Sequence, residues 1–240
     1  MSGIDDNRQR DGARRDRNRR WRWATFDCYG TLVDWNRGLR DELARLFGAQ
    51  ARDPALARYH QLEREIQARD PAAPYREVLA QALGDVAGSL GEELPAGERD
   101  ALGRSLPRWP VFDEVPASLT ELRRRGWRLV ILSNTDRDFI DASMERIGVP
   151  FELAIVASEI GSYKPAPGHW RKFLRVTGAD PARHVHVAAS LFHDIEPSHE
   201  LGIPCVWINR EGEAARGAPV AELPDLRELP DTLDRLVPAT

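Results

Sequence analysis

From residue 116 onward, short apolar runs alternate with amphipathic helical segments. Each run is about as long as one β-strand, and in chain order the runs read WRLVILSN, FELAIVASE, HVHVAAS and IPCVWINR. A further run, WRWATFD, precedes them and ends at Asp27. Continuous apolar runs separated by helices are typical of parallel strands covered on both faces. The pattern therefore predicts an α/β fold with a doubly wound parallel sheet.

The segment between the first two predicted strands has a different character. Residues 37–109 carry apolar side chains at three- and four-residue spacing and are rich in Ala, Leu, Glu and Arg. This spacing is typical of amphipathic helices, and no strand candidate interrupts them. We therefore expect an all-helical insertion at 37–109, with the α/β core formed by residues 21–36 and 110–240. A chain of 240 residues can bury a core of this size.

The N-terminus is basic and poor in apolar residues. Residues 1–22 hold eight arginines and four aspartates, although the whole chain has a net charge of −4. This composition predicts a disordered tail over residues 1–20. A basic arm can contact nucleic acid, but the body of the chain is acidic, so we expect a solvated tail and no nucleic-acid partner. With no apolar run near the roughly 18 residues of a membrane span and no signal peptide, we expect a cytoplasmic protein without membrane contact.

Polar residues cluster at the carboxyl ends of the predicted strands. In open parallel sheets, ligands bind in the crevice beyond these ends. Singly, each such residue could be a helix cap or a surface charge, but together they predict a polar site. They are, in chain order, Asp27, Ser133, Asn134, Lys164, Ser190 and Asp194.

Asp27 is the candidate nucleophile of this site. A carboxylate can attack an electrophilic centre, form a covalent intermediate and be freed by water. In a crevice it needs a positive partner to stay ionised, and Lys164 is the natural one. Asp194 can share that lysine and help to orient water. Ser133 and Asn134, with the N–H groups of the following helix start, are expected to receive negative charge on the substrate.

Four segments together resemble the motifs of the haloacid dehalogenase superfamily of hydrolases. In order, they are FDCYGTL, ILSN, YKP and AASLFHD. The resemblance covers about residues 22–35 and 110–210, and the helical block 37–109 matches the cap of that superfamily. It implies a Rossmann-like core and hydrolysis through a covalent aspartyl ester, with Asp27, Lys164 and Asp194 as catalytic residues.

Tyr29 favours one branch of the superfamily. Its phosphatases usually carry a second aspartate two residues after the nucleophile, which protonates the leaving alkoxide. The tyrosine is similar to the 2-haloacid dehalogenases, in which halide leaves without a proton. The resemblance thus implies a small 2-substituted carboxylic acid as substrate, with halide displaced from C2 to give a 2-hydroxy acid. Members of this branch often form dimers, which leaves a homodimer open.

The chain departs from this branch on the cap and in the fourth motif. The cap arginine that helps to hold halide has no counterpart in ARYHQLERE, which offers Tyr59 and His60, and we expect the offset Arg58 and Arg64 to point elsewhere. Where the fourth motif usually has Ser and Asn, this chain has Ala189 and Leu191. We assign substrate binding to Tyr29, Thr31, His60, Ser133, Asn134, Ser190 and the aromatic Trp170.

Two further residues stay ambiguous. His60 and Glu63 lie one turn apart on one cap helix, so they either face the crevice together or belong to a solvated helix face. His193, beside Asp194, is interpreted as a supporting residue without direct contact to substrate.

Three functions follow from these residues. We favour a cofactor-free, 2-haloacid dehalogenase-like hydrolase, because Lys164 can neutralise the site without metal. The first alternative is a Mg²⁺-dependent small-molecule phosphatase with the ion held by Asp27 and Asp194, although Ala189 removes a carboxylate that phosphatases commonly place there. The second is a catalytically weak binding protein, against which the Asp27, Lys164 and Asp194 set argues.

Overall fold

The computed structural model describes residues 20–214 and 217–239. Within these ranges, six parallel strands form one sheet in the order β3-β2-β1-β4-β5-β6. The predicted doubly wound parallel sheet is therefore confirmed, whereas the predicted tail lies outside the described residues except for Arg20. The strands are β1 (Arg22–Phe26), β2 (Trp127–Ser133), β3 (Leu153–Val156), β4 (His184–Ala188), β5 (Cys205–Ile208) and β6 (Ala221–Leu223).

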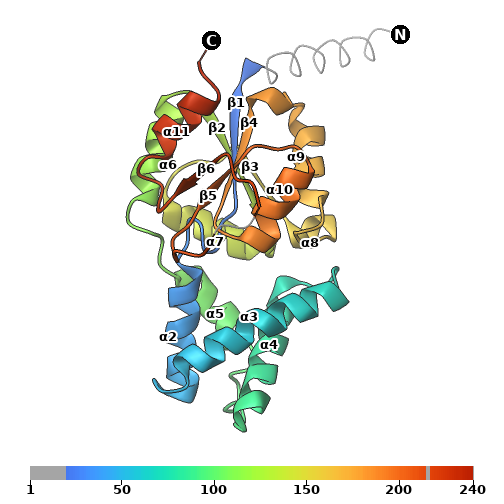
Figure 1. The fold of residues 1–240 in the computed structure, drawn as a ribbon. Helices are drawn as coiled ribbons and strands as arrows, with labels where there is room; N and C mark the ends of the chain where they lie inside the picture. The colour runs from blue at the N-terminus through green and yellow to red at the C-terminus, as the bar shows by residue number, and fades with distance from the viewer. Residues whose placement is uncertain (1–19, 215–216, 240) are drawn as a thin grey trace, which may run out of the picture.

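Helices cover both faces of the sheet because successive strand residues point to opposite sides. Ala24 and Phe26 belong to the apolar cluster that contains α6, α7 and α11, whereas Trp23 packs with Trp170 and Phe173 of α9. Figure 1 shows the two helical layers on either side of the strands. None of the helices in the described ranges is long and apolar enough to cross a membrane. The flanking elements are α6 (Val115–Arg124), α7 (Arg137–Ile147), α8 (Ala157–Ile160), α9 (Gly168–Thr177), η2 (Pro181–Arg183), α10 (Glu196–Glu200) and α11 (Leu229–Leu236).

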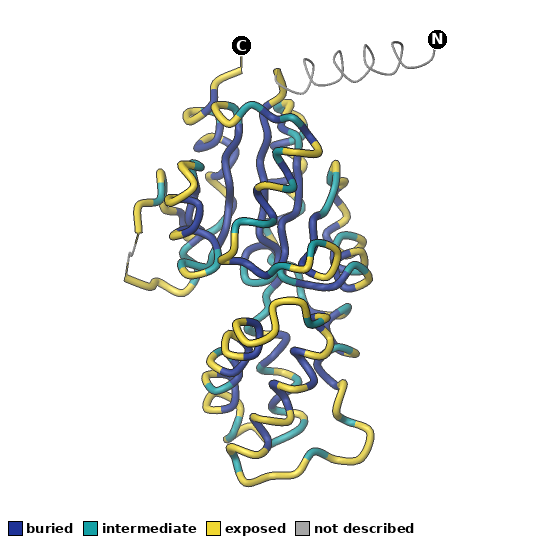
Figure 2. Tube along the Cα trace, turned by 90° about the vertical axis from the view of Figure 1, so that its right-hand side faces the viewer, coloured by how far each residue is buried: buried dark blue, intermediate teal, exposed yellow. Residues whose placement is uncertain are grey.

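A block of helices follows β1 and lies beyond the carboxyl ends of the strands (Figure 1). We call this block the cap. Its residues contribute to the same apolar cluster as one face of the sheet, and much of its outer side is exposed (Figure 2). In the sheet, β1, β4 and β5 are buried along their whole length, whereas β3 and β6 include partly exposed residues. Within the predicted helical block, residues 95–100 form turns and no helix: Gly97 has a φ of 81°, and the Glu98 N–H donates to the Pro95 carbonyl at 3.0 Å. The cap consists of α2 (Trp35–Phe47), α3 (Arg52–Arg69), α4 (Tyr75–Leu90), α5 (Ala101–Ser105) and η1 (Leu106–Arg108).

Several contacts join the cap to the core. At the chain crossings, Val33 bridges Val111, and the Phe112 N–H donates to the Leu32 carbonyl at 3.1 Å. Farther along, the core residue Asp136 accepts from the backbone N–H groups of Tyr75 at 2.8 Å and Arg76 at 3.1 Å, which are the first residues of α4. A carboxylate at this position satisfies orphan N–H groups and the helix dipole. These contacts hold the cap across the strand ends.

Candidate active site

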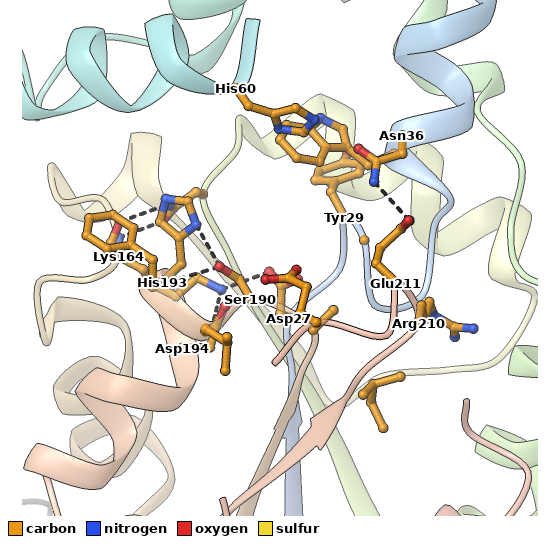
Figure 3. Close-up of a pocket in the computed structure, with 18 of the residues that line it drawn as sticks. Asp27, Tyr29, Asn36, His60, Lys164, Ser190, His193, Asp194, Arg210 and Glu211 are labelled. Carbon is orange, nitrogen blue, oxygen red and sulfur yellow. Dashed lines mark hydrogen bonds and ion pairs between the residues drawn. The ribbon is translucent and has the colours of Figure 1, made fainter. Parts of the chain in front are cut away.

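A cavity of about 700 Å³ lies between the strand ends and the cap. Cap helices α2 and α3 close one side of it, and the loops after β1, β2, β4 and β5 close the other (Figure 3). The carboxyl ends of parallel strands meet at one edge of a sheet, so residues far apart in sequence converge there. The predicted site residues that line the cavity are Asp27, Tyr29, His60, Ser133, Asn134, Lys164, Ser190 and Asp194.

The Lys164 ammonium lies between two carboxylates at the floor of the cavity. Its Nζ donates to Asp27 Oδ1 at 2.8 Å, to Asp194 Oδ1 at 2.7 Å and to the Leu132 carbonyl at 2.9 Å. The side chains of Lys164 and Asp194 are each 1% exposed. All three N–H bonds of the ammonium are therefore used, and its position relative to both carboxylates is determined.

Burial and the neighbouring charges have opposing effects on the pKa values of Asp27, Lys164 and Asp194. Burial raises the pKa of Asp27 above its usual range, and the nearby Lys164 opposes that rise. Although burial also acts on Asp194, Lys164 and His186 lower the pKa of Asp194 below its usual range. Burial disfavours the ammonium, but Asp194 and Asp27 raise the pKa of Lys164. Asp194 is thus the firmly ionised partner, and Asp27 is the more basic, more nucleophilic carboxylate.

Thr31 holds the candidate nucleophile Asp27 and is not among the residues that line the cavity, so this geometry does not support the substrate contact predicted for it. Its hydroxyl donates to Asp27 Oδ2 at 2.8 Å and accepts from the Ala189 N–H at 3.0 Å. Both oxygens of Asp27 therefore have partners, and the side chain is held in one orientation. Gly30, at φ 91°, provides the left-handed turn that brings Thr31 back under Asp27.

Trp170 is also wrong as a predicted substrate-binding residue. Its ring is buried on the outer face of the sheet, against Phe173 and with its centroid 5.4 Å from that of His186. It is not among the residues that line the cavity. Trp170 lies on α9, six residues after Lys164 in the sequence. Because α9 packs on β2 and β3, this position faces the core of the sheet and not the cavity.

Ser133 is the last residue of β2 and Asn134 follows it. The Asn134 side chain has hydrogen-bond partners within the protein, whereas the Ser133 hydroxyl has none among the described residues. The Asn134 amide donates to the Lys164 carbonyl at 3.0 Å and accepts from the Lys164 N–H at 2.7 Å. Asn134 therefore fixes the backbone of Lys164, a role that the predicted anion contact did not include. The Ser133 hydroxyl is buried and has no hydrogen-bond partner among the described residues.

Tyr29 lines the cavity, but its hydroxyl is engaged at the cavity wall. The Tyr29 hydroxyl and Ser143 Oγ are 3.0 Å apart, and the ring packs edge-on against Trp109. Burial raises the pKa of Tyr29 well above its usual range, so the phenol stays neutral. Its ring covers the position beside the nucleophile with an apolar surface.

A buried chain of side chains supports Asp194 from behind. His186 Nε2 lies 2.9 Å from Asp194 Oδ1, and His186 Nδ1 lies 2.9 Å from the Thr25 hydroxyl, which in turn lies 2.8 Å from His184 Nε2. The ionised Asp194 can only accept, so His186 donates to it through Nε2–H. Burial lowers the pKa of His184 to about 3, so this ring is neutral. Sequence reasoning did not identify these residues, because they lie inside apolar strands.

The cap contributes a polar face of α3 to the cavity. His60, Glu63, Arg64 and Gln67 all line it. Arg64 lies four residues, about one helical turn, after His60, so both are on the face of α3 that lines the cavity. The expectation that Arg64 points elsewhere is therefore wrong. His60 packs edge-on against Trp35, with ring centroids 4.6 Å apart. Burial, followed by the charge of Arg64, lowers the pKa of His60 to about 4, so the ring is neutral at neutral pH.

Glu63 is a buried carboxyl group on the cap. It is 4% exposed, its Oε1 accepts from the Tyr75 hydroxyl at 2.7 Å, and burial raises its pKa from 4.5 to about 7. A raised pKa means that the folded protein holds this proton more tightly than the unfolded chain. Stability is therefore lost as the pH rises from about 4.5 through about 7, because the unfolded chain ionises first. The full loss is roughly 3 kcal/mol.

We expect Glu63→Gln to remove this pH dependence, since the amide still accepts from Tyr75 and carries no charge. Relative to the unsubstituted protein, the variant should gain up to roughly 3 kcal/mol in free energy of unfolding at pH 8 and almost nothing at pH 4.5. Urea denaturation at both pH values measures this. Glu65→Gln, an exposed position on the same helix, is the control and should change little at either pH. An equal effect of Glu63→Gln at both pH values would contradict the assignment.

The carboxylates at the cavity floor do not fit a magnesium ion in this arrangement. Asp27 Oδ1 and Asp194 Oδ1 both bind the Lys164 ammonium, and Asp27 Oδ2 binds Thr31. Asp194 Oδ2 is the carboxylate oxygen of this pair without a partner among the described residues. Mg²⁺ is usually held through one or two carboxylates in octahedral oxygen coordination. Within the described ranges there is also no group of three or more His, Cys, Asp or Glu side chains placed to bind a metal.

Comparisons with known proteins agree with this geometry. A family model described as haloacid dehalogenase-like hydrolase matches residues 21–233. The (S)-2-haloacid dehalogenase of Pseudomonas sp. (strain YL) is 33% identical over 196 residues, which cover 78% of this chain and 82% of that protein. The phosphoserine phosphatase of Thermus thermophilus is 30% identical over 163 residues, or 66% of this chain and 65% of that protein. The structure of the L-2-haloacid dehalogenase from Xanthobacter autotrophicus superposes with a TM-score of 0.76 at 21% identity, covering 89% and 98% of the two chains.

Proposed function

The chain belongs to the haloacid dehalogenase-like hydrolase family, and on this basis we propose that it hydrolyses a small 2-substituted carboxylic acid, of the 2-haloacid type, through an ester on Asp27. The observation that carries the proposal is the environment of the nucleophile. Asp27 is oriented by Lys164 and Thr31, and the residue two positions on is Tyr29, whose hydroxyl is paired with Ser143. No carboxylic acid stands at that position to protonate a leaving alkoxide.

The proposed first step is displacement at C2. The Asp27 carboxylate attacks C2, the carbon–halogen bond breaks, and halide leaves with the bonding electrons, so no proton is needed. Lys164 keeps Asp27 in place during the attack, while the apolar ring of Tyr29 limits water beside it. The neutral His60 ring on the cap and the Ser133 hydroxyl offer polar contacts for the substrate within the same cavity.

The proposed second step is hydrolysis of the ester. Water attacks the Asp27 carboxyl carbon, the bond to the substrate oxygen breaks, and the 2-hydroxy acid leaves. Asp194 and its support from His186 and Thr25 keep Lys164 beside the ester, where its positive charge stabilises the negative charge that develops.

The test is release of chloride from (S)- and (R)-2-chloropropionate, run beside a panel of phosphate monoesters with and without Mg²⁺. We expect saturable chloride release without added metal, with a preference for one enantiomer. Mg²⁺-dependent phosphate release without chloride would instead support the phosphatase alternative, which one curated relative suggests by its name. Release of neither product across a broad set of 2-halo acids and phosphate esters would support the binding-protein alternative.

A further inference from the structure

A serine and a histidine are paired at the edge of the catalytic cluster. The π-helical turn η3 (Leu191–Ile195) follows β4. Ser190 is its N-cap and His193 is its third residue, and both line the cavity. The Ser190 Oγ accepts from the His193 backbone N–H at 3.1 Å and lies 3.0 Å from His193 Nδ1. Figure 3 shows the His193 ring beside Ser190, on the same side of the pocket as Asp194.

Lys164 and Asp194, the two charged groups of the cluster around Asp27, cannot take a proton from water. All three donors of Lys164 are engaged. Asp194 is 0% exposed; its Oδ1 binds Lys164 and His186, and its Oδ2 is buried out of reach of solvent. The fourth-motif positions that usually carry polar groups hold Ala189 and Leu191, and Leu191 packs against the apolar cluster around Trp207. Ester hydrolysis therefore needs a base from elsewhere in the wall.

His193 has the free nitrogen that this step needs. A serine hydroxyl has two lone pairs, so Ser190 Oγ can accept from both the backbone N–H and Nδ1–H of His193. In that tautomer Nε2 carries a lone pair, and no described residue is hydrogen-bonded to it. Burial lowers the pKa of His193 to about 4, so the ring is neutral at neutral pH. His60, the other imidazole in the cavity, packs on Trp35 and has no comparable hydrogen bond to orient it.

We propose that His193 is the general base that activates water for hydrolysis of the Asp27 ester, with Ser190 as its positioning residue. The water proton moves to Nε2 as the oxygen attacks the ester carbon. The bond between that carbon and the substrate oxygen then breaks, and the departing oxygen takes the proton back from the imidazolium. Asp27 is left as a carboxylic acid that loses its proton to solvent. This inference rests on the proposed function, because it assigns the base for its second step.

Rapid quenching of the full chain with 2-chloropropionate separates the two steps. In His193→Gln we expect a normal stoichiometric burst of chloride, followed by turnover that is slower by about 10²-fold or more. The intact mass of the quenched protein should show the ester accumulating on Asp27. Ser190→Ala should show the same accumulation to a smaller degree, and Ser190→Thr, which keeps the hydroxyl, should restore turnover. His199→Gln, an exposed histidine on α10, is the matched control and should behave as the unsubstituted protein.

The outcomes are distinguishable. A normal burst with undiminished turnover in His193→Gln, or loss of the burst in a folded variant, contradicts the role of His193 alone. Ester accumulation in His60→Gln instead of His193→Gln also contradicts it. Absence of any chloride burst in the unsubstituted protein contradicts the proposed function and this inference together. If His193→Gln does not fold, the comparison of Ser190→Ala with Ser190→Thr tests the proposal. Only a role in the second step predicts that the ester accumulates in Ser190→Ala and is hydrolysed normally in Ser190→Thr.

Discussion

Replacing Asp27 with asparagine is expected to lower turnover by about 10⁴-fold or more, because the amide cannot form the covalent intermediate. The fold should survive, since the amide oxygen can still accept from Lys164 and a buried charge is removed. We expect the free energy of unfolding to change by no more than about 1–2 kcal/mol. Steady-state rates with the best substrate, together with urea denaturation, measure both effects.

Mass spectrometry adds a second reading of the same variant. The quenched unsubstituted protein should yield a peptide esterified at Asp27, and Asp27→Asn should yield none. Asp85→Asn, an exposed aspartate on cap helix α4, is the control and should retain both the activity and the ester. Turnover within a few-fold of normal in Asp27→Asn would show that another group is the nucleophile.

Lys164→Met is expected to cause the largest loss of stability as well as loss of activity. Methionine fills similar space but leaves the Asp27 and Asp194 carboxylates buried without their cation. Removing one member of a buried ion pair costs about 3–5 kcal/mol, since a buried charge is left without compensation. We expect a decrease of this order in the free energy of unfolding, measured by urea denaturation at pH 7.

A second substitution tests the cause. In Lys164→Met/Asp194→Asn one of the two charges is removed, and we expect about 1–2 kcal/mol of stability to return while activity stays absent. Lys172→Met, at the other lysine of the chain, is the control and should change stability by less than about 0.5 kcal/mol. If the double variant is no more stable than Lys164→Met, the loss comes from packing and not from the charges.

The local sequence predicted the core well because its signals are local. Apolar runs of strand length, separated by helical patterns, indicate a parallel sheet wherever they occur, and the carboxyl ends of such strands must meet at one edge. Asp27, Lys164 and Asp194 therefore came together as expected. β6 was missed because its three residues are too few to show a pattern, and α11 lies in the Pro-rich C-terminal segment.

The errors share one physical cause. Trp170 and Arg64 were assigned from their positions along the chain, and Thr31 from its place in the first motif, but the packing of a helix or turn decides where a side chain points. The chain of His186, Thr25 and His184 depends on the register between β1 and β4, which pairs Thr25 with His186. Strand register follows from contacts across the whole sheet. The sequence around the two histidines therefore does not show which residue of β1 lies beside them.

For this protein, the sequence by itself determined the class of fold and the absence of a carboxylate at position 29, and it predicted Asp27 as the candidate nucleophile with Lys164 beside it. Each of these follows from residue type and strand pattern. The tertiary structure alone decided that Thr31 and Asn134 hold the catalytic groups, that Arg64 reaches the cavity, and that His193 presents a free nitrogen beside Ser190. Hydrogen-bond partners and exposure depend on which segments meet in space, and that is settled only when the cap, the turns and the strands are packed together.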